Sequence, residues 1–278
     1  MISLILAICS SAMIAVIMRL AQPRITYPTG LLAGNYIVCT LMALILSVSE
    51  FPALAPGDLL LPAGLGVVSG IMYLGSFALM QWNTRHNGVV LCSVFMKLGI
   101  LVPTLLSVIW FREMPTPVQI FGFLIALIAI VLINYQKGIR LSRSSWALIL
   151  MLLIGGMGDG MSKVYEVYGS PALKNCFLFF TFFAAMLLCL GWMYQKGEKL
   201  GAKELLFGAA LGVPNFLSSL FLLNALQTVP AVIAFPTFSV AVILVVSAAG
   251  LLFFRERLTP RQLWGGLLIC IALVLLNL

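Results

Sequence analysis

Two charged side chains lie deep inside apolar stretches of this 278-residue sequence. Lys97 is found in CSVFMKLGILVP, and Asp159 is found in IGGMGDGMSKVYE. A charge at the centre of a membrane helix costs about 2.5 to 3.5 kcal/mol on insertion scales, so each such residue needs a compensating role. The ammonium of Lys97 suits an anionic group of a ligand, most simply a carboxylate. The carboxylate of Asp159 suits a ligand ammonium group or a coupling proton.

Asp159 begins a charged stripe. Asp159, Lys163 and Glu166 are spaced four and three residues apart, which places them on one face of a helix. Self-neutralisation on that face would satisfy Lys163 and Glu166, which are near the end of the helix and can extend to water. It accounts less well for Asp159, because glycines at 155, 156, 158 and 160 let a backbone or a ligand approach closely.

Other polar residues inside the apolar stretches are weaker candidates. Uncharged side chains at such depth orient a substrate or, more commonly, form hydrogen bonds between helices. Arg19, near the end of the first apolar run, is a further charged candidate. The complete predicted set of substrate-binding residues is Arg19, Asn35, Tyr73, Lys97, Asp159, Lys163, Glu166, Asn215 and Asn224.

An intramembrane enzyme acting on lipid or peptide is the alternative reading of Asp159. Residues 156–159 read GMGD, which matches the Gly-x-Gly-Asp signature of intramembrane aspartyl proteases, where paired aspartates activate water. The other aspartate, Asp58, is in a polar connection, so the pair cannot be assembled. The single histidine, His86, and the scattered carboxylates offer no zinc or magnesium site. We therefore expect no enzyme, no metal and no cofactor.

The composition identifies the elements that must position these groups. The chain is 62% hydrophobic and 9% charged, with a mean hydropathy of +1.14, whereas about 25% charged is typical of soluble domains. Its ten apolar runs are long enough to cross a hydrocarbon core of about 30 Å. We expect an all-α polytopic membrane protein with ten transmembrane helices. They are predicted at roughly 2–20, 29–48, 61–82, 88–110, 118–135, 146–168, 173–194, 205–226, 231–253 and 262–278.

An internal repeat organises these helices. Phe111–Asn134 reads FREMPTPVQIFGFLIALIAIVLIN, and Phe254–Asn277 reads FRERLTPRQLWGGLLICIALVLLN, with 13 of 24 positions identical. We therefore expect two five-helix repeats, residues 1–139 and 140–278. Because each repeat has an odd number of helices, the second must be inverted relative to the first.

The two deepest charges have no counterpart in the other repeat. Lys97 aligns with Val240, and Asp159 aligns with Ala15. A duplicated scaffold that loses its symmetry at these two positions indicates a site rather than a repeated fold element.

Prolines are predicted to interrupt or bend three of the helices. Pro103 and Pro236 fall in the fourth helix of each repeat at non-equivalent positions, and Pro214 falls in the eighth helix. A missing backbone hydrogen bond at membrane depth is tolerated mainly beside a cavity or a neighbouring helix, so a hinge and a plain kink both fit.

Lysine and arginine are distributed unequally between the two sets of connections. Connections after helices 1, 3, 5, 7 and 9 hold twelve of them, and the opposite connections hold only Arg112 and Lys174. Cytoplasmic loops collect these residues, so both termini are predicted to face away from the cytoplasm. The net charge of +8 is therefore a topology signal rather than evidence for a nucleic-acid partner.

Each half of the chain closes with Phe-Arg-Glu, a Thr-Pro turn, a glutamine, a glycine and an apolar helix. This arrangement resembles the drug/metabolite transporter superfamily, particularly its EamA-type members. The resemblance implies a pseudo-twofold transporter whose helices 1–4 and 6–9 surround a central cavity, with helices 5 and 10 peripheral. Many relatives keep their termini in the cytoplasm, whereas the charge distribution here predicts the reverse.

The expected function is secondary active transport of a small polar metabolite by alternating access, either proton-coupled or as an exchange. Lys97 and Asp159 together favour an amino-acid-like zwitterion or another carboxylate over a hydrophobic cation, which a buried lysine would repel. No GxxxxGK[ST] sequence occurs, so ATP hydrolysis is not expected. The expected partners are a small-molecule substrate and membrane lipids. We expect a monomer or homodimer in a bacterial inner membrane, with no nucleic-acid partner.

Overall fold

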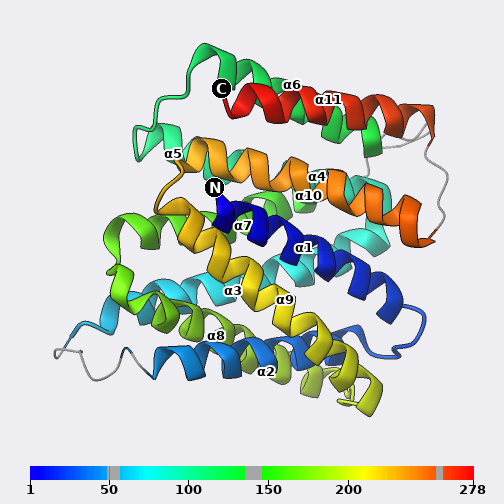
Figure 1. Ribbon diagram of the computed structural model, residues 1–278. Coiled ribbons are helices and arrows are strands. Elements are labelled where there is room, and N and C mark those ends of the chain that lie inside the picture. The colour runs from blue at the N-terminus through cyan, green and yellow to red at the C-terminus, as the bar shows by residue number, and fades with distance from the viewer. Residues whose placement is uncertain (49, 51–56, 135–145, 255–258) are drawn as a thin grey trace. The chain divides into compact units, whose positions relative to one another are not determined.

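The computed structural model describes residues 1–48, 50, 57–134, 146–254 and 259–278 (Figure 1). Their regular secondary structure is helical. The helices are α1 (Ile2–Ala21), α2 (Pro28–Ser47), α3 (Leu60–His86), α4 (Val89–Leu98), α5 (Leu101–Ile109), α6 (Pro117–Asn134), α7 (Trp146–Tyr168), the 3₁₀ turn η2 (Pro171–Leu173), α8 (Lys174–Gln195), α9 (Ala202–Leu226), α10 (Ala231–Phe254) and α11 (Pro260–Leu276).

These helices confirm the expected all-helical membrane fold. Nine helical segments in the described part of the chain are long and apolar enough to cross a membrane, and α4 and α5 together supply one of them, Leu91–Ile109. The tenth, α11, is a shorter apolar helix. Most ends of the predicted helices differ from the observed ends by a few residues.

The helices form two compact units. One comprises Met1–Leu74 and Met161–Gln227, and the other comprises Gly75–Gly160 and Thr228–Leu278. The helices α3 and α7 contribute to both units. Each unit takes helices from both halves of the sequence, so this division differs from the repeat boundaries, which stay a prediction.

In the first unit, α2 packs closely against α9 because both helices carry glycines four residues apart. The pairs are Gly30 with Gly34, and Gly208 with Gly212. A Cβ atom on Gly208 would lie 2.6 Å from the carbonyl oxygen of Leu31 and 2.8 Å from the Cα of Gly34. Small residues at this spacing let two membrane helices bring their backbones together.

The same unit pairs α2 with α8, and Glu50 binds the start of α8. This residue follows α2, and its carboxylate accepts hydrogen bonds from the backbone N–H groups of Asn175 (3.3 Å) and Cys176 (3.0 Å). The side-chain amide of Asn175 donates a third hydrogen bond, at 2.7 Å. The first N–H groups of a helix have no partner within the helix and attract negative charge, so this contact fixes the beginning of α8.

The opposite end of the α2–α8 pair is fixed in the same way. Glu204, in the first turn of α9, accepts hydrogen bonds from the backbone N–H groups of Thr26 (2.8 Å) and Tyr27 (3.3 Å), immediately before α2. The hydroxyl of Thr29 donates to Glu198, which follows α8. Each helix is therefore followed by carboxylates that bind the beginning of the other, and the two helices run antiparallel.

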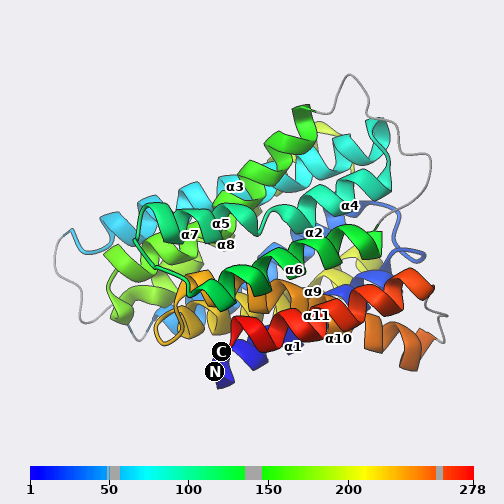
Figure 2. The ribbon, with the colours of Figure 1, turned by 90° about the horizontal axis from the view of Figure 1, so that it is seen from above.

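In the second unit, the two copies of the repeated phrase pack against each other. The helices α6 and α11 lie side by side in both views (Figure 1, Figure 2). A Cβ atom on Gly122 would lie 2.9 Å from Leu275, and one on Gly265 would lie 2.2 Å from Ile133. Gly122 and Gly265 occupy the same position in the two copies, and each contacts the far end of the other helix. The copies are therefore antiparallel, as the inverted repeat predicts.

The Thr-Pro-x-Gln part of the phrase begins these two helices. Thr259 precedes α11, its side chain accepts a hydrogen bond from the backbone N–H of Gln262, and the Gln262 side chain accepts one from the backbone N–H of Thr259. Thr116 and Gln119 exchange the same pair of hydrogen bonds before α6. This reciprocal cap, followed by a proline at the first helical position, explains why the motif recurs at the same place in both halves.

The fourth membrane span is discontinuous. Pro103 has no N–H to donate to the carbonyl of Gly99, which instead accepts a 3.0 Å hydrogen bond from Val102, and α4 ends before α5 begins. The span predicted as one helix over 88–110 is therefore broken at 99–100. The interruption predicted at Pro236 is absent, since α10 is continuous there, and α9 likewise runs continuously through Pro214.

Candidate functional site

The predicted substrate-binding residues are divided between the two compact units. Lys97 and Asp159 belong to the unit that contains the α4–α5 break. The other unit contains Arg19, Asn35, Tyr73, Lys163, Glu166, Asn215 and Asn224.

The helix that carries Asp159 contacts the break beside Lys97. A Cβ atom on Gly156 of α7 would lie 2.3 Å from the carbonyl oxygen of Gly99 and 2.6 Å from the Cβ of Val102, so no larger residue fits there without movement. Lys97 is two residues before Gly99, and Asp159 is three residues after Gly156. The two deepest charges are therefore carried by helices that touch at the discontinuity.

The glycines around Asp159 have partners in the protein. A Cβ atom on Gly155 would lie 2.8 Å from the hydroxyl oxygen of Ser76 in α3, and one on Gly160 would lie 3.2 Å from Leu106 in α5. The approaching group that the sequence predicted at these glycines is thus a neighbouring helix. This packing fixes α7 against α3 and α5, and it holds the backbone of Asp159 in place.

Lys97 lies in the last turn of α4 and is partly buried. Its ammonium makes no hydrogen bond or ion pair with any residue in the described ranges. A lysine near a helix C-terminus is favoured by the helix dipole, which is one reason for its presence there. An unpaired ammonium at membrane depth is also a strong attraction for an anionic group.

Lys163 and Glu166 form an ion pair. The Lys163 ammonium is 2.5 Å from a carboxylate oxygen of Glu166, and Lys163 is only 6% exposed. This geometry agrees with the simpler interpretation of the sequence, in which these two residues neutralise each other on one face of a helix.

The predicted asparagines bridge helices. Asn215 of α9 donates a 3.1 Å hydrogen bond to Asn35 of α2, which is 2% exposed. Asn224 accepts a 2.7 Å hydrogen bond from Lys174, at the start of α8. Interhelical bonding was the commoner use expected for such residues, and the partner Lys174 was not foreseen because it is 50 residues away in the sequence.

The two remaining candidates occupy different positions on their helices. Arg19 is exposed in the last turn of α1, and Tyr73 is partly buried within α3. No group of three or more histidine, cysteine, aspartate or glutamate side chains that could hold a metal occurs among the described residues.

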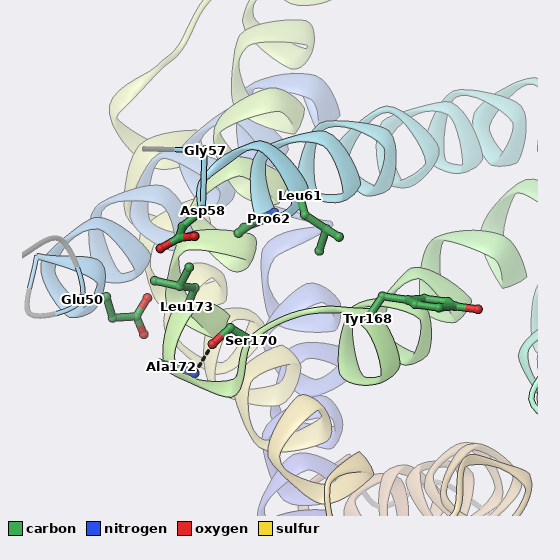
Figure 3. A pocket seen from close by; sticks show the side chains of 9 residues that line it. All are labelled: Glu50, Gly57, Asp58, Leu61, Pro62, Tyr168, Ser170, Ala172 and Leu173. Atoms are coloured by element: carbon green, nitrogen blue, oxygen red, sulfur yellow. Dashed lines mark hydrogen bonds between the residues drawn. The ribbon is translucent and has the colours of Figure 1, made fainter. Parts of the chain in front are cut away.

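A pocket of about 520 Å³ lies in the first unit, between the segment after α2 and the end of α7 (Figure 3). Glu50 and Asp58 present their carboxylates at one side of it, and the ring of Tyr168 is at the other. Its lining includes no lysine or arginine and none of the predicted substrate-binding residues. The lining residues are Glu50, Gly57, Asp58, Leu61, Pro62, Tyr168, Ser170, Ala172 and Leu173.

The sequence signal for this pocket was the presence of two acidic residues in one short connection, in a chain with only eight. Since Glu50 also binds the start of α8, its first role is structural. The pocket lies at the ends of helices rather than at their centres.

Comparisons with known proteins agree with the fold. Residues 141–278 match the EamA-like transporter family. An uncharacterised protein of Haemophilus influenzae is 22% identical over 279 residues, covering 98% of this chain and 96% of that protein. A crystal structure shares the fold over 99% of this chain and 94% of its own, with a TM-score of 0.79 at 13% identity. The chain is therefore a multi-pass membrane protein whose residues 141–278 match the EamA-like transporter family.

Proposed function

We propose that this chain is a secondary transporter that moves a small polar metabolite across a bacterial inner membrane by alternating access. The observation that carries the proposal is Lys97, whose ammonium has no partner among the described residues and lies in the last turn before the α4–α5 break. Discontinuous membrane helices recur at the substrate sites of secondary transporters, because the break exposes polar groups at membrane depth. The match of residues 141–278 to a transporter family supports a small-molecule substrate.

The charges at this place favour a carboxylate substrate, most simply an amino-acid-like zwitterion. Lys97 binds the anionic group. Asp159, on the helix that touches the break, binds a substrate ammonium or carries a coupling proton. A hydrophobic cation is disfavoured, because the unpaired ammonium of Lys97 would repel it.

The decisive variant is Lys97→Met, tested with a ligand found by thermal-shift screening of the wild-type protein against a metabolite library. Methionine keeps the length and the apolar stem while it removes the charge, so the variant should fold but lose binding and proteoliposome flux. Val240→Met is the matched control, because Val240 aligns with Lys97 in the other repeat. Normal flux with unchanged affinity in Lys97→Met would remove Lys97 from the site.

Asp159→Asn separates the two roles of the carboxylate. If Asp159 carries the coupling proton, the variant loses gradient-driven accumulation but keeps exchange between two loaded compartments, since exchange needs no net proton movement. If it binds the substrate ammonium, exchange and binding fall together. Wild-type accumulation by this variant between about pH 5.5 and 8 would exclude both roles.

Both termini of this transporter face away from the cytoplasm in our proposal, because cytoplasmic loops collect lysine and arginine. A C-terminal reporter that is active only in the cytoplasm should remain silent. Strong reporter activity would reverse the orientation and leave the inverted repeat unaffected.

A further inference from the structure

Two asparagines meet where α2 packs against α9 in the first unit. Asn215 lies 13 residues after the first residue of α9 and 11 before the last, so it is near the middle of that span. Its side-chain amide donates a 3.1 Å hydrogen bond to the side-chain oxygen of Asn35. The backbone of Asn35 packs directly on α9, since a Cβ atom on Gly212 would lie 2.8 Å from the Asn35 carbonyl oxygen. The pair is therefore held in a fixed place at membrane depth.

This bridge uses only part of the hydrogen-bonding capacity of the two amides. A carboxamide has two N–H donors and an oxygen with two acceptor sites. The Asn35 oxygen accepts from Asn215 and, at 3.8 Å, from the thiol of Cys39. The amide nitrogen of Asn35 and the amide oxygen of Asn215 bond no residue in the part of the chain that the structure describes. Buried polar groups normally have partners, because an unpaired one away from water costs free energy.

Both spare atoms border open space. Asn35 is only 2% exposed and Asn215 is partly buried. Even so, neither atom is among the fully enclosed side-chain atoms that lack a partner in the described ranges. Each therefore borders space that can hold at least a water molecule, and a group that enters this space meets a donor and an acceptor together.

The pair offers one donor and one acceptor whichever way its two amides are turned. Amide oxygen and nitrogen have nearly the same shape, so both side chains can be rotated by half a turn. The bond then runs from Asn35 to Asn215, and the spare atoms become the Asn215 nitrogen and the Asn35 oxygen. A carboxylate has no donor for the spare oxygen, and an ammonium has no acceptor for the spare N–H. An uncharged group that both donates and accepts satisfies the two atoms.

We propose that Asn35 and Asn215 recognise an uncharged donor–acceptor group of the transported substrate, most simply the side-chain carboxamide or hydroxyl of a polar amino acid. The inference rests on the proposed transport function and adds to it the class of side chain that the substrate carries. The positions aligned with the pair in the other predicted repeat, Phe179 and Ile71, are apolar. The repeated fold therefore does not require amides at these positions.

The test measures ligand preference on the purified full chain, from the melting temperature as a function of ligand concentration. The probes are sets of free amino acids of nearly equal shape: asparagine, aspartate and leucine; glutamine, glutamate and methionine; threonine and valine. In the wild type, the uncharged polar member of at least one set should bind about tenfold more tightly than its partners. A site with paired hydrogen-bonding groups rejects ligands that leave those groups unsatisfied.

Asn215→Leu removes the spare acceptor with little change in shape. The preference should fall about tenfold in this variant, while the binding of leucine, methionine and valine is retained. Thr181→Val is the matched control, because it removes a buried hydroxyl from the same unit that bonds only Phe177 of its own helix. The melting temperature without ligand verifies folding, and Asn215→Ala replaces a leucine variant that does not fold.

Other results contradict the inference. If the wild type shows no preference within any set, or if Asn215→Leu keeps the full preference, the pair is only a bridge between helices. Failure of the proposed function is distinguishable, because Lys97→Met would then bind every amino acid normally, whereas Asn215→Leu changes only the differences within a set. If no amino acid of any set binds the wild type, the proposed substrate class and this inference are both wrong.

Discussion

The fourth spans of the two predicted repeats differ in structure. The first copy is broken into α4 and α5, and the second, α10, is one continuous helix. Each contains a proline, yet only Pro103 accompanies a break. The residue four positions before Pro103 is Gly99, whose carbonyl contacts α7 at Gly156, whereas the residue four positions before Pro236 is Val232.

The aligned residues Lys97 and Val240 differ in the same way. Val240 is fully buried in an apolar cluster with Ala129, Ile130 and Ile269, and Lys97 is a partly buried charge. The core needs α10 to be regular and apolar, while nothing in the packing requires the charge of Lys97. The continuous copy, α10, can therefore maintain the core, while the other copy departs from regular helical structure.

The most direct test of this difference is to place the charge in the second copy, at Val240. Val240→Lys buries an ammonium among alanine and isoleucine side chains, which we expect to destabilise the protein by about 3 kcal/mol or more. The measurement is the yield and the melting temperature of monodisperse protein in detergent, with Val240→Met as control. A stable Val240→Lys variant would show that the two copies are interchangeable.

A smaller loss of stability is expected when α7 is pushed away from the α4–α5 break. Gly156→Ala places a methyl group 2.3 Å from the carbonyl oxygen of Gly99, and such overpacking costs about 1 to 3 kcal/mol. Gly266→Ala is the control, because a Cβ atom there meets nothing within 4 Å. Equal melting temperatures for the two variants would mean that α7 does not depend on close contact with the break.

The smallest effect concerns the junction between the two copies. Glu113, which follows α5, accepts a 2.9 Å hydrogen bond from the backbone N–H of Val232 at the start of α10. Glu113→Gln keeps an acceptor but removes the charge, so we expect a loss of about 0.5 to 1.5 kcal/mol. Thermal unfolding should show a larger loss for Glu113→Ala, and an unchanged melting temperature in both variants would contradict the capping role.

Run length and hydrophobicity were sufficient to predict the helices, because only apolar segments of this length can span a bilayer. Interruptions were predicted at both Pro103 and Pro236, and only the one near Pro103 is present. Four prolines lay in predicted spans, and the sequence does not reveal that α9 and α10 stay continuous through Pro214 and Pro236. What decides the outcome is the pairing of Gly99 with Gly156, which are 57 positions apart in the sequence.

The candidate site was predictable to a similar degree. Lys97 and Asp159 could be selected from depth and broken symmetry, and the ion pair of Lys163 and Glu166 from helix spacing. The carboxylates that bind helix starts were missed, since Glu204 and Thr26 are separated by 178 residues. Local patterns cannot reveal such contacts, because they arise only when distant helix ends are brought together.

The reciprocal contacts of the α2–α8 pair have a consequence for how the protein meets its surroundings. Both helices can cross a membrane, and they run antiparallel, so Glu50 lies at one end of the pair and Glu204 at the other. The two carboxylates therefore lie at opposite ends of a helix pair that is long enough to cross a membrane. The pair is thus held at both of its ends by a carboxylate that binds helix-start N–H groups, and loss of one carboxylate would leave the contact at the other end in place.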